Sequence, residues 1–352
     1  MDSVIYRVQK MFSYLQESQK RYFNPGGFCY AFKDPERPGM PTPTREQRDA
    51  SGFYLGLLNS IRDTCVTTEY NEQVISNFQM QSMLELSATA GDGTKLKKLN
   101  KKAKDNMLSV RVRDLSGLEE SLDNYFAGEQ VDGYKWEREN GEEERLPTLK
   151  RDTIKTLPET LVFHLQRFET DYMMDPPQTK KINSRFVIPQ TLDMTKYTLE
   201  GRTMDEDNKP LPHPDEYYQF ELHGITIHTG TANGGHYYSY ARERGSYPAN
   251  WMCFNDEKVK KWSVDNLERD CFGGETERNG RKYQNMANAF MVFYERKKKI
   301  VSKDGKSGSS REVSHNGANV TLDEESKSSD SLGAGVMAVA AVGKMLHNTE
   351  EF

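Results

Sequence analysis

Two stretches decide how this chain folds: GGHYYSY at Gly234–Tyr240 and WMCFND at Trp251–Asp256. Both are rich in aromatic residues and have the composition of β-strands. A pair of glycines lets another backbone approach closely, which suits a histidine at the mouth of a narrow cleft. An Asn or Asp on the neighbouring strand can hold the imidazole through its second ring nitrogen, as an orienting residue does for a general base. The pattern predicts such a pair between His236 and either Asn255 or Asp256, although a packed strand histidine next to a turn would show the same residues.

The rest of the chain is helical first and β-rich later. Apolar residues recur at helical spacing over Val4–Leu15 and Ala50–Ile61, and a shorter helix is predicted over Leu115–Phe126. Thr44, three residues before Gln47, predicts a capping box at the start of the second helix. Strands are predicted over Leu161–Phe168, Phe220–His228, Tyr237–Ala241, Trp251–Phe254 and Ala289–Glu295. This order favours an α+β fold over an alternating α/β fold.

Composition sets limits on both packing and partners. The 352 residues carry a formal net charge of −5 at pH 7, which is too near balance for a nucleic-acid-binding protein of this length. Only 35% of the residues are apolar while 29% are charged, so part of the chain is expected to be unpacked. We expect that part to be a disordered low-complexity tail at residues 298–352. Two charge runs, Thr94–Lys104 and Glu137–Arg145, are predicted to be solvated loops.

Cysteine spacing and hydropathy indicate where the protein acts. The four cysteines form no CxxC pair, and no charged-then-apolar run opens the chain, which argues against a secreted disulfide scaffold and a signal peptide. The longest apolar stretch, Gly333–Val342, is about half of the roughly 20 residues needed to cross a bilayer. We therefore expect an intracellular protein without a membrane span, acting in the cytoplasm, with the nucleus left open as a second location.

The two aromatic stretches resemble the His box of the ubiquitin-specific proteases, which are papain-like cysteine deubiquitinases. Four further segments resemble parts of the same family and occur in the family's order. QRDASGF resembles its Gln-x-Asp-Ala-x-Glu-Phe box, LPETLVFHLQRF resembles its Leu-Pro-x-x-Leu-x-x-x-Leu-x-Arg-Phe strand, and CFGGE with NAFMVFYER resembles the end of the domain in the very large fat-facets-type members. These segments lie at Gln47–Phe53, Leu157–Phe168, Cys271–Glu275 and Asn288–Arg296. Together they cover about residues 1–297, which we expect to form one ubiquitin-specific protease domain.

The resemblance implies a fold shaped like a right hand, with a helical thumb, a β-rich palm and β fingers at about residues 78–151. It implies a thiol-dependent hydrolase that removes ubiquitin from protein conjugates, with ubiquitin and ubiquitinated proteins as partners. By the same likeness His236 is the general base, Asn255 its orienting partner and Asp256 a following acidic residue near the active centre. The residues that the resemblance places against the ubiquitin tail are Gln47, Asp49, Gly234, Gly235 and Tyr237.

One departure from the family concerns the nucleophile. The family's Cys box, Gly-Leu-x-Asn-x-Gly-x-Thr-Cys-Tyr, has no counterpart upstream of Gln47 in this sequence. Asn24–Tyr30 imitates the box, but Cys29 lies only 18 residues before Gln47. Pro35 and Pro38 also exclude the helix that should follow a nucleophile, so we expect Cys29 to be an ordinary buried thiol. We therefore expect an N-terminally truncated protease domain that is inactive alone, and the alternative is a catalytically dead pseudo-deubiquitinase that binds ubiquitin or acts as a scaffold.

A second departure concerns the fingers. Many family members hold them with a zinc ion bound by two CxxC pairs, but residues 78–151 contain no cysteine. The sequence therefore predicts no metal and no cofactor. Without a metal, strand pairing and apolar contacts must stabilise these hairpins.

Overall fold

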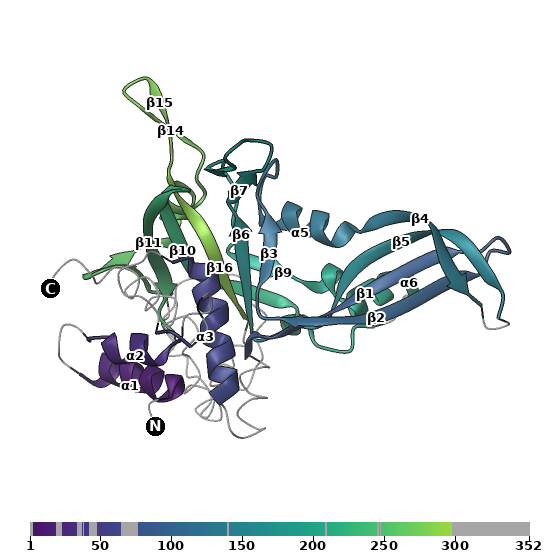
Figure 1. The fold of residues 1–352 in the computed structure, drawn as a ribbon, viewed down its shortest axis with the longest axis horizontal. Coiled ribbons are helices and arrows are strands. Elements are labelled where there is room, and N and C mark those ends of the chain that lie inside the picture. The colour runs from purple at the N-terminus through teal and green to yellow at the C-terminus, as the bar shows by residue number, and fades with distance from the viewer. Residues whose placement is uncertain are drawn as a thin grey trace, which may run out of the picture.

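The structure, a computed structural model, describes most of the chain up to Lys297. The described residues are 3–18, 23–33, 37, 39–41, 48–64, 77–138, 141–207, 210–244, 246 and 248–297. They form a layer of helices, a large central sheet and a second sheet that extends to one side (Figure 1). No helix within these ranges is long and apolar enough to cross a membrane. The predicted tail at residues 298–352 lies outside the described residues, as do Thr44 and Gln47.

Within the described ranges the central sheet, here called the palm, has eight strands in the order β13-β12-β11-β10-β16-β6-β3, with β9 paired to the first residues of β10. All neighbouring strands are antiparallel except β3 and β6, which run parallel. The strands are β3 (Leu108–Arg111), β6 (Thr160–Gln166), β9 (Thr191–Asp193), β10 (Gln219–Thr231), β11 (Gly234–Arg242), β12 (Trp251–Asn255), β13 (Lys258–Trp262) and β16 (Ala287–Arg296). Each of the five strands predicted from the sequence lies in this sheet, so the β-rich half of the α+β prediction is confirmed.

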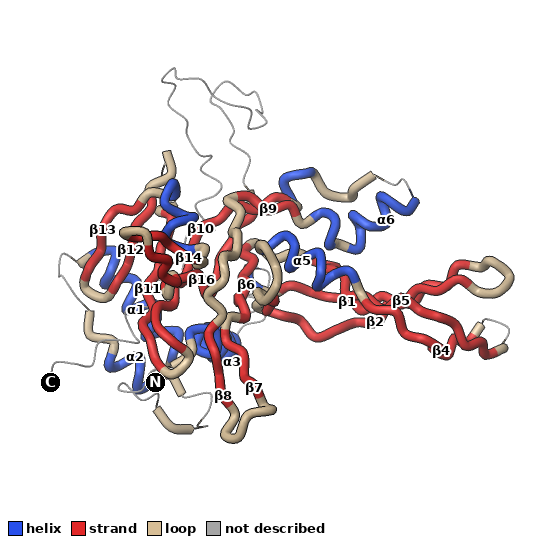
Figure 2. The backbone as a smooth tube through the Cα atoms, turned by 90° about the horizontal axis from the view of Figure 1, so that it is seen from above, coloured by secondary structure: helices blue, strands red, loops and turns tan. Residues whose placement is uncertain are grey.

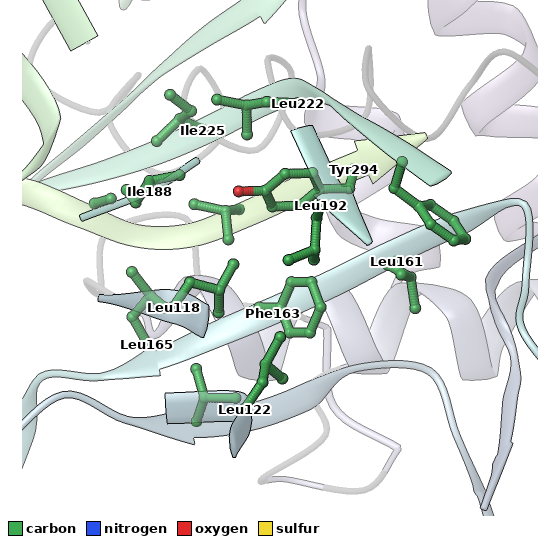
Figure 3. Close-up of a cluster of buried hydrophobic side chains, with 14 of the residues drawn as sticks. Leu118, Leu122, Leu161, Phe163, Leu165, Ile188, Leu192, Leu222, Ile225 and Tyr294 are labelled. Carbon is green, nitrogen blue, oxygen red and sulfur yellow. The ribbon is translucent and has the colours of Figure 1, made fainter. Parts of the chain in front are cut away.

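The two faces of the palm bury different apolar cores. On one face, Phe163, Leu165 and Ile225 pack with α5 (Leu118–Ala127), the short helix predicted from the sequence (Figure 3). On the other face, Val162 packs with side chains of the helical layer. Because β6 is buried on both faces, it is a nearly continuous apolar run rather than an alternating one. The sheet is thereby held from both sides.

Among the described residues, three helices form the layer on the second face, here called the thumb: α1 (Val4–Glu17), α2 (Gly26–Ala31) and α3 (Ala50–Thr64). Helices α1 and α3 confirm the two predictions made from apolar periodicity, since residues of both stripes, such as Val8 and Phe53, are buried. Helix α2 is an addition to the prediction. It begins after a turn in which Asn24 Oδ1 accepts a hydrogen bond of 2.8 Å from the Gly26 N–H.

Helix α3 begins at Ala50, and residues 48 and 49 are not helical. The capping box predicted at Thr44 and Gln47 lies outside the described residues. Asp49 is the N-cap, because its Oδ1 accepts a hydrogen bond from the Gly52 N–H with an N···O distance of 2.9 Å. An aspartate directly before the apolar stripe offers a strong cap, and the helix follows it.

The second sheet, here called the fingers, has four antiparallel strands among the described residues, in the order β2-β1-β5-β4, and extends away from the palm (Figures 1 and 2). Its strands are β1 (Met80–Thr89), β2 (Lys95–Asp105), β4 (Glu129–Glu137) and β5 (Glu143–Thr156). They follow the range predicted for the fingers closely, except that β3 and α5 interrupt it and pack in the palm core. Towards the outer end, Leu86, Trp136 and Leu146 form a small core of their own.

The two charge runs are not simply the solvated loops that the sequence predicted. Thr94–Lys104 lies almost entirely in the edge strand β2, and the described part of Glu137–Arg145 includes the end of β4 and the start of β5. The charges find partners across the sheet, as where Lys97 Nζ lies 3.1 Å from a carboxylate oxygen of Glu85. Lysine also suits an edge strand, because it opposes pairing with another sheet. The prediction was wrong because it considered charge without strand pairing.

Two hairpins and several short helices complete the described fold. Strands β7 (Phe168–Asp171) and β8 (Gln178–Lys181) form a hairpin that follows directly on β6. Strands β14 (Glu275–Arg278) and β15 (Arg281–Gln284) form a second hairpin, which projects at the top of Figure 1. The short helices are α6 (Leu199–Asp207), α7 (Leu267–Cys271) and the 3-10 turns η1 (Thr195–Tyr197), η2 (Asp215–Tyr217) and η3 (Val264–Asn266).

Arg167 fixes the point at which the chain leaves β6. Its side chain is fully buried, and its guanidinium donates to the carbonyls of Ala289 at 2.6 Å, Ile182 at 3.0 Å and Ser184 at 3.2 Å. Burial lowers the pKa of Arg167 to about 9. By binding these carbonyls, Arg167 ties β16 and the segment after β8 to the end of β6.

Candidate active site

His236 and Asn255, the predicted base and orienting residue, lie in contact. His236 is near the start of β11 and Asn255 ends β12, and the register of these two strands brings the side chains together. The distance from His236 Nε2 to Asn255 Oδ1 is 2.7 Å. The His236 side chain is 21% exposed, so the ring is shielded but not sealed from solvent.

This contact fixes the tautomer of the imidazole. The Oδ1 atom of an asparagine only accepts hydrogen bonds, so Nε2 of His236 must donate. A neutral imidazole carries one N–H, and its other nitrogen, Nδ1, keeps a lone pair that can take up a proton. Nδ1 is therefore the atom of His236 that can act as a general base.

Asp256 places a carboxylate beside the same imidazole. Its Oδ2 lies 3.6 Å from His236 Nε2, while its Oδ1 is buried without a hydrogen-bond partner. Asp256 lies in the turn between β12 and β13 with a φ of 50°, a left-handed conformation that Asp tolerates better than most residues. The carboxylate is placed to stabilise the imidazolium that forms when His236 accepts a proton.

At Gly235 the backbone makes the close approach that the glycine pair predicts. A Cβ atom there would lie 2.4 Å from His228 Nε2 and 2.3 Å from the carbonyl oxygen of Thr229. Both distances are too short for any side chain, so only glycine fits without a shift of the strand. Gly234, the first residue of β11, is exposed. The backbone of β11 at Gly235 therefore packs directly against the His228 side chain, and His236 is the residue that follows Gly235.

His228 supports this strand as a packed and neutral residue. Its side chain is 4% exposed, and its ring centroid lies 4.9 Å from that of Tyr237 and 5.2 Å from that of Phe168. Burial, together with the positive charge of Lys181, lowers the pKa of His228 to about 4. His228 is thus uncharged at neutral pH and contributes packing beneath the site.

Lys181 is a residue near the site that the sequence analysis did not find. Its Nζ donates to the carbonyl of His228 at 2.9 Å and to that of Met286 at 2.7 Å. Burial, and then the charge of Arg167, lowers the pKa of Lys181 to about 7. A lone lysine in β8 gives no signal in the sequence, because its two carbonyl partners lie 47 and 105 residues further along the chain.

Of the residues predicted to face the ubiquitin tail, those that the structure describes lie at the start of α3 and in the first part of β11. Gly234 and Gly235 are the first two residues of β11. Burial, and then the charge of the Asp49 carboxylate, raises the pKa of the Tyr237 phenol. Gln47 lies outside the described residues. The contacts of this set with a ligand stay a prediction.

The described cysteines do not have the surroundings of a reactive thiolate. Cys29 in α2 is half-buried against the thumb core, and Cys253 and Cys271 are buried. Burial raises the pKa of all three thiols, whereas a nucleophilic cysteine needs a lowered pKa. Cys65 lies outside the described residues. The three described thiols therefore have the environment of packing residues.

In the part of the chain that the structure describes, no group of three or more His, Cys, Asp and Glu side chains is arranged to hold a metal ion. The outer end of the fingers contains the apolar cluster of Leu86, Trp136 and Leu146. Trp136 Nε1 also donates to Thr148 Oγ1 over 2.8 Å. The apolar cluster and this hydrogen bond hold the strands together at this end. That the fingers bind no metal stays a prediction.

The sequence is similar to a family of known hydrolases. The family model described as ubiquitin carboxyl-terminal hydrolase matches residues 1–294. The chain is 29% identical over 310 residues to ubiquitin carboxyl-terminal hydrolase 34 of Homo sapiens, and 32% identical over 324 residues to the probable ubiquitin carboxyl-terminal hydrolase FAF of Drosophila melanogaster. Each alignment covers 83% of this chain but only 8% and 11% of those proteins, so the chain spans about a tenth of their length. The resemblance to the very large fat-facets-type members is confirmed.

The fold is similar to solved structures of the SAGA Ubp8/Sgf11/Sus1/Sgf73 DUB module. For the module bound to ubiquitin aldehyde, the TM-score is 0.53 at 20% identity, covering 82% of this chain and 53% of that chain. For the module bound to monoubiquitin, the TM-score is 0.51 at 24% identity, covering 72% and 49%. These similarities confirm the predicted papain-like hand, in which the thumb, palm and fingers described above are the three parts.

Proposed function

This chain belongs to the ubiquitin carboxyl-terminal hydrolase family, and we propose that it forms the ubiquitin-binding and general-base part of a cysteine-type deubiquitinase domain. The proposed substrates are protein conjugates of ubiquitin, and the reaction is hydrolysis of the bond after the C-terminal glycine of ubiquitin. The observation that carries the proposal is the 2.7 Å contact between His236 Nε2 and Asn255 Oδ1. This contact keeps His236 Nδ1 unprotonated, so that Nδ1 can accept the proton of a nucleophilic thiol.

The chain's own residues account for the proton transfers of this reaction. His236 Nδ1 takes the proton of the thiol, and the thiolate attacks the carbonyl carbon of the scissile bond. Asp256, 3.6 Å from Nε2, stabilises the imidazolium, which then gives its proton to the leaving amine. In the second half, His236 takes a proton from the water that hydrolyses the thioester. Asn255 holds the ring in one orientation through these steps.

We propose that the thiol comes from outside the described residues. The support is the raised pKa of Cys29, Cys253 and Cys271, each caused by burial. Cys253 and Cys271 are also part of the palm core, where no substrate carbonyl could reach them. A Cys box such as the family's would present the missing thiol to His236.

A second candidate function is ubiquitin binding without cleavage. The same burial of the three thiols favours it, because a site with a base and an orienting residue but no reactive thiol could hold a ubiquitin tail intact. The two functions share ubiquitin binding and differ only in the covalent step. An experiment that reads the two separately will distinguish them.

The test compares two forms of the protein: this chain, and the chain extended at its N-terminus by the Cys box of a fat-facets-type relative. We expect the chain itself to bind ubiquitin, and to form no covalent adduct with ubiquitin that carries a C-terminal electrophile. The extended form should react at the added cysteine, and His236→Ala should slow that reaction by roughly 10²–10⁴-fold, the range for loss of a general base. His213→Ala, at an exposed histidine stacked on Tyr217, is the matched control and should change neither readout.

Each other outcome has a clear meaning. An adduct on Cys29, Cys65, Cys253 or Cys271 of the unextended chain, located by mass spectrometry, would place the nucleophile within this chain. Ubiquitin binding by the extended form without an adduct would support the second function. Absence of ubiquitin binding in both forms would contradict both functions.

A further inference from the structure

The palm and the fingers meet where helix α5 ends and strand β4 begins (Figure 1). Gly128, the residue between them, has a φ of 87°. A Cβ atom there would lie 2.5 Å from Arg151 Cβ and 2.7 Å from the carbonyl oxygen of Lys150, so the backbone at this crossing lies directly against β5. The C-terminal end of a palm helix is therefore next to a strand of the fingers.

Arg202 of α6 joins the two sheets at this crossing. Its Nη2 donates to the carbonyl of Phe126 in α5, and its Nη1 donates to the carbonyl of Asp152 in β5, each over 3.0 Å. Its Nε donates to the carbonyl of Lys196 in η1 over 3.3 Å. Nη1 also lies 4.0 Å from Oε2 of Glu85 in β1, and the Arg202 side chain is only 11% exposed. One guanidinium thus contacts the palm and the fingers at once.

The acceptor on the palm side is well suited to a cation. Phe126 is in the last turn of α5, where carbonyls have no hydrogen-bond partner within the helix. This end of a helix also carries a partial negative charge, which attracts a guanidinium. The Phe126 side chain is buried in the palm core, with its ring centroid 5.1 Å from that of Tyr197. Arg202 therefore bonds to a carbonyl that the core holds in place.

Helix α6, which carries Arg202, is itself fixed to the palm. The hydroxyl of Tyr218 donates to Glu200 Oε1 over 2.8 Å, and Tyr218 is buried in the palm core. Thr198, between η1 and α6, is also buried, and its Oγ1 accepts from the Gly201 N–H over 3.0 Å. Tyr197 of η1 belongs to the palm core as well. The guanidinium therefore reaches the fingers from an element that belongs to the palm.

We propose that Arg202 is a positioning residue that sets the angle between the fingers and the palm. The base of the fingers is attached by apolar burial, since Met80 of β1 and Ile154 of β5 belong to the palm core. That burial keeps the sheet attached when the guanidinium is lost, but apolar contacts are not directional and do not fix an angle. The hydrogen bonds of Arg202 are directional, because a planar guanidinium donates in a fixed fork.

The angle matters for a ligand that contacts both sheets. A ubiquitin lying against the palm and the fingers binds only those molecules in which the two sheets have the right angle, and its measured affinity is reduced by that fraction. Arg202 keeps the fraction high before the ligand arrives. This inference rests on the proposed function for the identity of the ligand, whereas the angle is a property of the free chain.

The test measures the angle as a distance between two spin labels by pulsed electron paramagnetic resonance. The labels are attached to keto amino acids at Lys95, at the outer end of the fingers, and at Lys261 of β13, both exposed. The unmodified chain should give one narrow distance distribution. Arg202→Met removes the guanidinium but keeps an unbranched side chain, and it should widen the distribution at least twofold. If about a tenth of the molecules then keep the right angle, the Kd for ubiquitin rises about tenfold.

Two further variants calibrate these readouts. Arg202→Lys keeps the charge but not the fork, so it should give an intermediate width. Arg145→Met, at an exposed arginine of β5, is the matched control and should change neither the distribution nor the affinity. Amide exchange of β6 and β1 shows whether the palm and the fingers are folded in each variant.

An unchanged distance distribution in a folded Arg202→Met protein would overturn the proposal. So would loss of amide protection in both Arg202 variants, because the guanidinium would then be needed for folding rather than for the angle. A wider distribution with unchanged ubiquitin affinity would overturn the link between the angle and binding. A wider distribution in Arg202→Met, when the unmodified chain binds no ubiquitin, would support the positioning role and contradict the proposed function alone.

Discussion

The palm and the fingers are both sheets of one chain, but different forces stabilise them. In the palm, β6 buries both faces, and Phe163 and Leu165 are fully buried. In the fingers, β2 exposes most of its side chains, and Lys97 and Arg151 surround Glu85, whose side chain is 1% exposed. Apolar burial therefore contributes most of the stability of the palm, while strand pairing and ion pairs contribute much of the stability of the fingers. The two sheets should respond differently to the same perturbation.

The largest difference is expected on loss of a core side chain. Phe163→Ala in β6 should lower the free energy of unfolding by about 3–5 kcal/mol, because the surrounding side chains cannot fill the cavity. Leu99→Ala in β2, where the leucine is 39% exposed, should cost less than about 0.5 kcal/mol. Urea denaturation measures both values. Equal losses would show that the fingers bury their side chains as completely as the palm.

This contrast also explains how far the sequence predicts the structure. Burial on both faces makes β6 an apolar run, which the sequence displays directly, whereas the lysines of β2 become strand residues only through partners far along the chain. In the site, His236 and Asn255 are predicted because their residue types and order carry the chemistry. The contacts of Lys181 with the carbonyls of His228 and Met286 depend on tertiary proximity, for which the sequence has no pattern.

Acidification should weaken the part of the palm that faces the thumb before it weakens the fingers. Burial lowers the pKa of His228 to about 4, against about 6.5 in an unfolded chain. Between pH 6.5 and 4 the unfolded chain binds a proton that the folded chain does not, so stability falls by roughly 3 kcal/mol over this window and then levels off. Amide hydrogen exchange of β10 and β11 as a function of pH measures the loss.

The fingers should have a different pH window. The pKa of Glu85 is lowered on folding, so its contribution is complete above the unfolded value of about 4.3 and is lost only as pH falls below it. At pH 5 the exchange of β1 and β5 should therefore be unchanged. His228→Gln should reduce the pH dependence of amide exchange in β10 and β11, whereas His213→Gln, at an exposed histidine, should leave that pH dependence unchanged. Earlier loss of protection in the fingers would contradict this assignment.

A smaller effect is expected from the ion cluster of the fingers. Burial alone would raise the pKa of Glu85, but hydrogen bonds and charges from Arg151 and Lys97 lower it below its usual value. Glu85→Gln should therefore cost about 2 kcal/mol, seen as faster amide exchange in β1 and β5 but not in β16 of the palm. Glu129→Gln breaks an exposed pair with Lys150 and should change little. Faster exchange in β16 as well would mean that the two sheets unfold as one unit.

The smallest effect, none at all, is expected from a metal chelator. A zinc ion that cross-links hairpins needs four ligands, mainly thiolates and imidazoles, and residues 78–151 contain no cysteine and no histidine. The apolar cluster around Trp136, which is 6% exposed and bonded to Thr148, occupies the outer end of the fingers instead. A chelator should leave the melting temperature unchanged, whereas Trp136→Ala should lower the protection of β4 and β5.

Elemental analysis makes this last prediction quantitative, since protein purified without added metal should hold well under one zinc per chain. The argument depends on ligand supply: thiolate zinc sites contribute folding energy directly, so a chain that used one would lose structure together with its metal. Stoichiometric zinc released along with the structure of the fingers would contradict the prediction. It would direct attention to Cys253, Cys271 and His228, whose side chains are buried in the palm, and would make the two sheets depend on one shared site. Chelation without any change would leave the fingers as a sheet held by pairing, ion pairs and one small apolar core.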